Sequence, residues 1–433
     1  MQLGVPQGSV LCCRKQLHCR QPASRGCEPA HRPSQQPATV ACRRQRQASS
    51  LQVQATAEAA TEARPSGLTP FAAVRSEEEF FGALQKGVDS GKLPKELYPA
   101  FKDFYNNYKQ TVLNSDAPDA SPELVAEVMG SIADRTFNQF LDPYTFPSYH
   151  TRLLEPYDYY KFGQNYVRTL INFNKSVVGH LDRFRKVQEQ LDAGENVVLL
   201  ANHQTEADPG VWALLLEKVL PRLATEIIYV AGDRVVADPL CKPFSMGRNL
   251  FCVHSRKRMD DIPELKAEKM ATNRRTLGAM VKELSKGGKL VWIAPSGGRD
   301  RPDPQSGDWL PHRYDPGAVE LMRTMMAKSK KPGHLWPMAM YSWEVMPPPA
   351  GLEKNLGERR LTGYAGTGIS LAEELDVDAV LSGIPAEQRQ ERQQKLTETA
   401  WQAAVEEFKL ISDAIHNDTV RATSNMHSQP WKD

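Results

Sequence analysis

Short apolar runs rich in β-branched residues recur along the C-terminal two thirds of the chain. Stretches with apolar residues at helical spacing separate them, at 209–222, 263–286 and 316–329, and a long amphipathic helix is predicted at 385–416. A short continuous apolar run is typical of a buried strand, and its alternation with helices favours an α/β fold. We therefore predict a sheet flanked by helices, with strands at 197–200, 227–230, 250–253, 290–293 and 335–340.

The region 69–148 has helical periodicity throughout. Ser121-Pro122 combines a favourable N-cap with proline at the first helical position, and Asp142-Pro143 should end the same helix. Along that helix the residues that recur at helical spacing are Leu124, Val128, Ile132, Thr136 and Phe140. Because no chemical motif occurs here, we predict a small helical bundle domain for packing or partner docking, followed by a catalytic α/β domain at 149–433.

Composition changes sharply in residues 1–55. This stretch is rich in Arg, Ser and Gln, has Glu28 as its one acid, and is broken by Pro6, Pro22, Pro29, Pro33 and Pro37. Such a composition cannot bury a core, and it lacks the apolar run of a secretory signal. The prolines also disfavour the amphipathic helix of a mitochondrial presequence. We predict a disordered chloroplast transit peptide at 1–55, processed near 51–55.

Removing this leader changes the charge balance. Eight basic residues and one acidic residue are lost, so the 54 basic and 52 acidic residues of the whole chain become 46 and 51, a net charge of −5. This net negative charge argues against general nucleic-acid binding, which requires a basic face. Outside the leader, Cys241 and Cys252 alone build no disulfide framework or zinc site. No run approaches the ~20 apolar residues that span a bilayer, so we expect a soluble protein.

A histidine and an aspartate follow the first predicted strand of the α/β region. His203 comes directly after that strand, and Asp208 stands five residues later, before Pro209 and the next helix. The aspartate can fold back to hold one ring nitrogen, which leaves the other to act as a general base on a hydroxyl nucleophile. Taken alone, the two residues could equally be a turn histidine and an N-cap. A metal site that adds Glu206 is disfavoured, because no other histidine stands at ligand spacing.

Two cationic loops also begin where predicted strands end. The segment 254–258 contains Lys257 and Arg258, and the segment 294–301 contains Arg299 and Arg301. Each segment alone could be an ordinary solvated loop. Several fixed cations together with the glycines of 294–301, which let backbone N–H groups approach a ligand, suit a phosphate dianion. The combination predicts a small phosphate ester as substrate.

At these residues the sequence resembles the glycerolipid acyltransferase family, whose first motif is a histidine and an aspartate separated by four residues. Segments 202–209, 247–249, 294–301 and 337–339 look like those of its soluble plastid members, which acylate glycerol 3-phosphate. The similarity covers nearly all of the chain after residue 70 and extends to the leader. One position departs from the pattern, because plant members carry Lys-His where this chain has Lys257-Arg258. A role specific to imidazole at that position is therefore put in doubt.

The resemblance implies a mixed α/β sheet flanked by helices and an acyl transfer in the chloroplast stroma. The acyl group would pass from acyl carrier protein, or from CoA, to the sn-1 hydroxyl of glycerol 3-phosphate, the first step of plastid glycerolipid synthesis. His203 would be the general base and Asp208 the orienting carboxylate, with no cofactor or metal required. The phosphate ligands carried over from the family would be Lys257, Arg299 and Arg301. Arg258, which stands in place of the family's histidine, would add a permanent cation as a fourth ligand. No nucleic-acid partner is implied, and transient membrane association stays open.

Three other functions are considered. Acylation of a lysophospholipid belongs to enzymes that generally carry membrane segments, and none is predicted in this sequence. A serine hydrolase is disfavoured because the Gly-x-Ser-x-Gly pattern does not occur. A catalytically silent module that binds phosphate or acyl carrier protein would not need the His203 and Asp208 pair. A turnover assay distinguishes that module from an enzyme.

Overall fold

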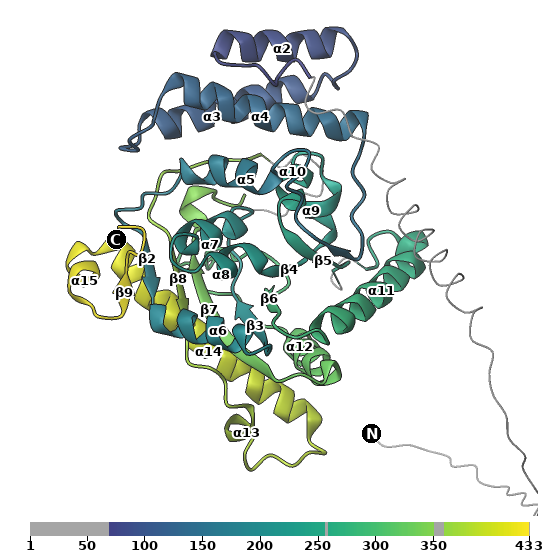
Figure 1. Cartoon of the computed structure of the whole chain (residues 1–433), viewed down its shortest axis with the longest axis vertical. Coiled ribbons are helices and arrows are strands. Elements are labelled where there is room, and N and C mark those ends of the chain that lie inside the picture. The colour runs from purple at the N-terminus through teal and green to yellow at the C-terminus, as the bar shows by residue number, and fades with distance from the viewer. Residues whose placement is uncertain (1–68, 256–258, 350–358, 433) are drawn as a thin grey trace, which may run out of the picture. The chain divides into compact units, whose positions relative to one another are not determined.

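The computed structural model describes residues 69–255, 259–349 and 359–432. The predicted transit peptide at 1–55 lies outside these residues, as do Lys257 and Arg258. The first described elements are three helices that pack together (Figure 1), namely α2 (Glu77–Asp89), α3 (Leu97–Leu113) and α4 (Pro122–Leu141). As predicted, Ser121 caps α4: its Oγ accepts a hydrogen bond of 3.1 Å from the Leu124 N–H. The predicted apolar stripe is buried at Val128 and Ile132, whereas Phe140 in the last turn is exposed.

A nine-stranded mixed sheet forms the centre of the described residues, with the order β1-β5-β4-β6-β3-β7-β8-β2-β9. Five consecutive strands, β5, β4, β6, β3 and β7, are parallel to one another, so their carboxyl ends meet at one edge. Antiparallel pairing joins β1 to β5, β7 to β8 and β2 to β9. The strands are β1 (Tyr149–His150), β2 (Val177–Gly179), β3 (Asn196–Ala201), β4 (Ile228–Ala231), β5 (Asn249–Cys252), β6 (Leu290–Ile293), β7 (Gly333–Tyr341), β8 (Gly368–Leu371) and β9 (His427–Ser428). The mixed sheet flanked by helices confirms the predicted fold class.

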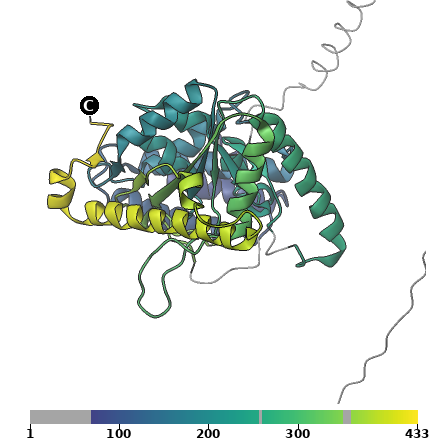
Figure 2. The same ribbon diagram turned by 90° about the horizontal axis from the view of Figure 1, so that it is seen from below.

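Strand β3 shows why its sequence is apolar throughout. Side chains of a strand point alternately to the two faces of a sheet. Val197 and Leu199 join the hydrophobic cluster that contains the helices before and after β3. Val198 and Leu200 join a second cluster on the opposite face, formed with α12 (Pro316–Ser329) and α14 (Arg389–His416). Figure 2 shows α14 as the long yellow helix that lies across this part of the molecule. Both faces of β3 are therefore buried.

The helices that connect these strands agree with the sequence in most places. One prediction was too long: the helix expected at 209–222 is two helices, α7 (Asp208–Leu216) and α8 (Pro221–Glu226), because Pro221 starts a new helix. The remaining helices are α5 (Tyr159–Arg168), α6 (Leu181–Asp192), α9 (Asp233–Ala237), α10 (Lys242–Met246), α11 (Lys266–Leu284), α13 (Val377–Val380) and α15 (Asp418–Thr423), with 3-10 turns η2 (Pro263–Leu265) and η3 (Trp343–Val345).

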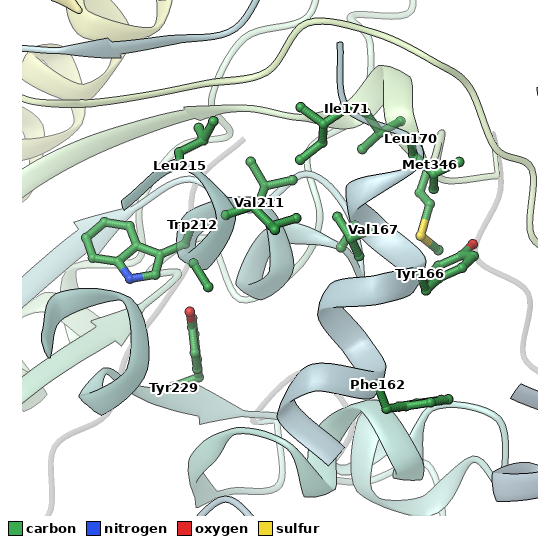
Figure 3. Close-up of a cluster of buried hydrophobic side chains, with 14 of the residues drawn as sticks. Phe162, Tyr166, Val167, Leu170, Ile171, Val211, Trp212, Leu215, Tyr229 and Met346 are labelled. Carbon is green, nitrogen blue, oxygen red and sulfur yellow. The ribbon is translucent and has the colours of Figure 1, made fainter. Parts of the chain in front are cut away.

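Close packing of α5 on α7 fixes the segment that begins at Asp208. Figure 3 shows Val167 of α5 beside Val211 of α7, within a buried apolar cluster. Gly210, in the first turn of α7, permits this approach: a β-carbon at that position would lie 2.8 Å from Cγ2 of Val167. Such a contact is too short for two carbon atoms, so any larger residue would push α7 away from α5. Gly210 thereby helps to set the position of Asp208 relative to the sheet.

Candidate active site

His203 lies just beyond the carboxyl end of β3 and contacts Asp208, as the sequence predicted. Its Nδ1 is 2.7 Å from Oδ2 of Asp208. About 27% of the His203 side chain is exposed, whereas Asp208 is almost completely buried. An ionised carboxylate only accepts hydrogen bonds, so Nδ1 carries the proton and Nε2 is the basic nitrogen. This is the geometry that a histidine needs to remove a proton from a substrate hydroxyl.

The Asp208 carboxylate is held by three further donors. Its Oδ2 accepts the Gln204 N–H at 2.9 Å, and its Oδ1 accepts the Thr205 N–H at 3.2 Å. The hydroxyl of Ser342 donates to the same Oδ1 at 2.6 Å. Ser342 follows β7, which pairs with β3 in parallel register, so two neighbouring strands bring it to the aspartate. Four donors on one buried carboxylate offset the cost of removing its charge from water.

Aromatic rings line the histidine on one side. The ring of Trp292, on β6, meets the His203 ring edge to face, with centroids 5.6 Å apart and planes at 86°. Tyr229, on β4, lies behind it with its ring centroid 5.7 Å from that of Trp292. Among the described residues, neither the indole N–H of Trp292 nor the hydroxyl of Tyr229 has a hydrogen-bond partner, although both atoms are buried. The Trp292 ring therefore packs against one side of the His203 imidazole.

Asp300 connects the second cationic loop to the histidine. Its N–H donates to the His203 carbonyl at 2.6 Å, and its Oδ2 accepts from Asn202 Nδ2 at 2.9 Å. Its Oδ1 accepts the His312 N–H at 3.0 Å. Burial raises the pKa of Asp300 to about 7, because these hydrogen bonds only partly compensate for the lost hydration. The loop that carries Arg299 and Arg301 is thus tied directly to the residues around His203.

Of the four predicted phosphate ligands, Arg299 and Arg301 are among the described residues, and their guanidinium groups have different contacts. Arg299 Nη1 lies 3.8 Å from Oε1 of Glu206, within the loop between His203 and Asp208. The Arg301 guanidinium donates from Nη1 to the carbonyls of Asp300 and Arg299, at 2.8 and 3.3 Å. Lys257 and Arg258 lie outside the described residues. The strand that precedes them, β5, is three places from β3 in the sheet order.

Two residues near the histidine carry no local sequence signal. One is Ser342, described above, and the other is Arg360, whose Nε lies 3.1 Å from Oε2 of Glu206. Burial opposes ionisation of Glu206, but the charges of Arg360 and Arg299 outweigh it and lower the pKa of that carboxyl. Glu206 therefore serves as an anion between two arginines. Both Ser342 and Arg360 reach the site through tertiary structure alone.

No helix in 69–255, 259–349 or 359–432 is long and apolar enough to cross a membrane. Over the same ranges, no cluster of three or more His, Cys, Asp or Glu side chains is arranged to hold a metal ion.

Comparison with known proteins identifies the family. A model of the glycerol-3-phosphate acyltransferase N-terminal region matches residues 69–144, and an acyltransferase model matches residues 183–341. The chloroplastic glycerol-3-phosphate acyltransferase of Carthamus tinctorius is 44% identical over 349 residues, which cover 80% of this chain and 74% of the relative. That of Arabidopsis thaliana is 42% identical over 364 residues, covering 83% and 79%. The chain belongs to the glycerol-3-phosphate acyltransferase family.

The limits of the two family models can be placed on the fold. The N-terminal model of the glycerol-3-phosphate acyltransferases covers α2, α3 and α4 and ends at residue 144, before β1. The acyltransferase model includes His203 and Asp208, the loop with Arg299 and Arg301, and all of β7. It ends at Tyr341, directly before Ser342, and does not reach Arg360. The relatives are named as chloroplastic proteins, in agreement with the predicted destination of this chain.

Proposed function

We propose that this chain transfers an acyl group from a thioester donor to the primary, sn-1 hydroxyl of glycerol 3-phosphate, with His203 as general base. The product is 1-acyl-sn-glycerol 3-phosphate, made in the chloroplast stroma. The observation that carries the proposal is the contact of 2.7 Å between His203 Nδ1 and Asp208 Oδ2 at the carboxyl edge of the sheet. The family assignment supplies the reaction class, and this contact supplies a base for it.

The reaction requires one base and no cofactor. Nε2 of His203 removes the hydroxyl proton as the oxygen attacks the thioester carbonyl carbon. The Asp208 carboxylate stabilises the imidazolium that forms and keeps the ring in the correct tautomer. When the tetrahedral intermediate collapses, a C–O ester bond has formed and the C–S bond breaks. The proton held by His203 passes to the departing thiolate, and the histidine is neutral again.

The acceptor phosphate is proposed to bind Arg299 and Arg301, together with Lys257, which matches the family, and Arg258, which replaces the family's histidine with a permanent cation. Guanidinium groups donate paired hydrogen bonds to phosphate oxygens, and a charged pair in a partly dry site is stronger than one in open water. β6, which precedes the arginine loop, is the direct neighbour of β3. This adjacency supports a short acceptor with a hydroxyl at one end and a phosphate at the other.

The donor is proposed to be acyl carrier protein, with acyl-CoA as the alternative. The experiment supplies radiolabelled glycerol 3-phosphate with palmitoyl- or oleoyl-acyl carrier protein, or with the matching CoA thioesters, to the full chain and to the chain without residues 1–55. Label should enter the lipid fraction as monoacylglycerol phosphate, faster with the carrier protein than with CoA. Absence of label with every donor would refute the proposed reaction, whereas faster transfer from CoA would refute only the donor.

A further inference from the structure

The carboxylate of Glu206 is shared by two arginines that come from distant parts of the chain. Its Oε2 is 3.1 Å from Nε of Arg360, which is hydrogen-bond distance. Its Oε1 is 3.8 Å from Nη1 of Arg299, which is longer than a hydrogen bond. Arg299 is a proposed phosphate ligand, whereas Arg360 has no role in the mechanism above. Glu206 is therefore hydrogen-bonded to Arg360, whereas its contact with Arg299 is a longer ion pair.

A largely buried network fixes Arg360. Its Nη2 lies 3.6 Å from Oδ2 of Asp238 and 3.0 Å from Sγ of Cys241. The side chains of Arg360 and Asp238 are each only 9% exposed. A guanidinium with so little water around it requires anionic partners. Separating Arg360 from Glu206 and Asp238 would leave a buried charge uncompensated, which is strongly unfavourable.

The backbone next to Arg360 is also anchored. Two residues on, the N–H of Thr362 donates to Oδ1 of Asn107 on α3 at 2.6 Å, and the Thr362 carbonyl accepts from the Thr111 hydroxyl at 3.0 Å. The N–H of Gly363 donates to the Val345 carbonyl at 3.0 Å. Arg360 therefore approaches Glu206 from a backbone segment that α3 and η3 hold in place.

Glu206 and a bound phosphate would compete for the same cation. Carboxylate and phosphate are both anions that a guanidinium binds through its N–H groups. From 3.8 Å, an approach of about 1 Å would bring Oε1 of Glu206 to hydrogen-bond distance from Arg299. The existing ion pair would then shorten to a hydrogen bond, and one donor group of Arg299 would be occupied. Whatever holds Glu206 in its present position also preserves the affinity of Arg299 for phosphate.

We propose that Arg360 is a positioning residue for acceptor binding: it holds Glu206 back from Arg299, so that Arg299 can receive the phosphate of the acceptor. This inference rests on the proposed role of Arg299 in the function above. A purely structural role for Arg360 leads to a different expectation. In that case, removing Glu206 as well as Arg360 would impair the enzyme further than removing Arg360 alone, because a second member of the buried network is lost. If Arg360 instead positions Glu206, removing Glu206 as well should lower the raised KM for glycerol 3-phosphate again.

The test compares steady-state kinetics of Arg360→Gln, Glu206→Gln and the double variant with those of the unchanged protein. Arg360→Gln should raise KM for glycerol 3-phosphate about tenfold and change kcat less than about twofold, since a phosphate anchor contributes uniform binding. The double variant should return KM to within about threefold of the original value, because no carboxylate remains to close onto Arg299. Arg359→Gln is the matched control: it removes the neighbouring charge, which is 61% exposed and pairs with Asp103. That control should leave both constants unchanged.

An unchanged KM in Arg360→Gln, or a double variant no better than Arg360→Gln, would overturn the inference. If Arg360→Gln does not fold, Arg360→Met, which also removes the cation, and its double variant with Glu206→Gln replace it, and the same comparison applies. Arg299→Gln is measured in the same series. A normal KM in that variant would refute the phosphate assignment itself. A raised KM in Arg299→Gln with a normal KM in Arg360→Gln would refute only the positioning role.

Discussion

The hydroxyl of Ser342 donates a hydrogen bond of 2.6 Å to Oδ1 of Asp208, the carboxylate oxygen that does not contact His203. Ser342 is completely buried, so removing its hydroxyl leaves a carboxylate oxygen short of one donor in a dry environment. The bond links the end of β7 to the base that follows β3. It extends the histidine and aspartate pair to a third residue, which the sequence did not single out.

Ser342→Ala should therefore lower kcat without changing KM for glycerol 3-phosphate. A less firmly held Asp208 orients His203 less well, and we expect kcat to fall about tenfold, which corresponds to about 1.4 kcal/mol. The measurement is steady-state turnover with saturating donor. Ser329→Ala, which removes a buried hydroxyl bonded to Met326 O in α12, serves as the control and should keep the original kcat. Equal kcat values in the two variants would show that the bond to Asp208 does not matter for turnover.

Arg299→Ala should raise KM for glycerol 3-phosphate and leave kcat nearly unchanged. A charged hydrogen bond is worth about 1.5–3 kcal/mol, so the increase should be about 10- to 100-fold. Arg301→Ala should raise KM less, because the Arg301 guanidinium already donates to the carbonyls of its own loop. Arg313→Ala is a suitable control, since its guanidinium is exposed and pairs with Glu398. A larger effect of Arg313 than of Arg299 would place the phosphate elsewhere.

The stability of the protein should depend on pH through Asp300. Its pKa is about 7 in the folded protein, whereas the ordinary value for an aspartate is 3.8, so between these two values the folded state binds more protons than the unfolded state. The contribution of Asp300 to the free energy of unfolding should therefore fall as pH rises from about 4 to about 7, by up to about 1.4 kcal/mol per pH unit, and stay constant above pH 7. Denaturant unfolding of the original protein and of Asp300→Asn, compared at each pH, isolates this term. Parallel pH profiles would contradict it.

The central strands were predictable because strands buried on both faces consist of continuous apolar runs, which are visible in the sequence. The five predicted runs correspond to β3, β4, β5, β6 and β7, with bounds that agree for β6 and differ by one or two residues for the others. The edge strands were missed, because β1 and β9 contain only two residues each and have no apolar run to mark them. The break between α7 and α8 was missed because the apolar spacing continues across it, although Pro221 marks the start of α8.

The candidate site was predictable only where it is local. His203 and Asp208 are five residues apart, so one turn brings them together and their spacing is visible in the sequence. Ser342 and Arg360 come from more than a hundred residues away, and only the pairing of β3 with β7 and the fold of the following segment bring them near. No local pattern marks either residue. The loop that carries Arg299 and Arg301 could be located because it follows a strand, but the partners of Arg301 depend on the conformation of its loop.

The most direct test of the central claim is the turnover number of His203→Ala, measured with glycerol 3-phosphate and acyl-acyl carrier protein. If His203 is the general base, kcat should fall about 10²–10⁴-fold, while circular dichroism and thermal unfolding remain close to those of the original protein. A correctly folded variant with the original kcat would contradict the account, because another group would then have to remove the hydroxyl proton.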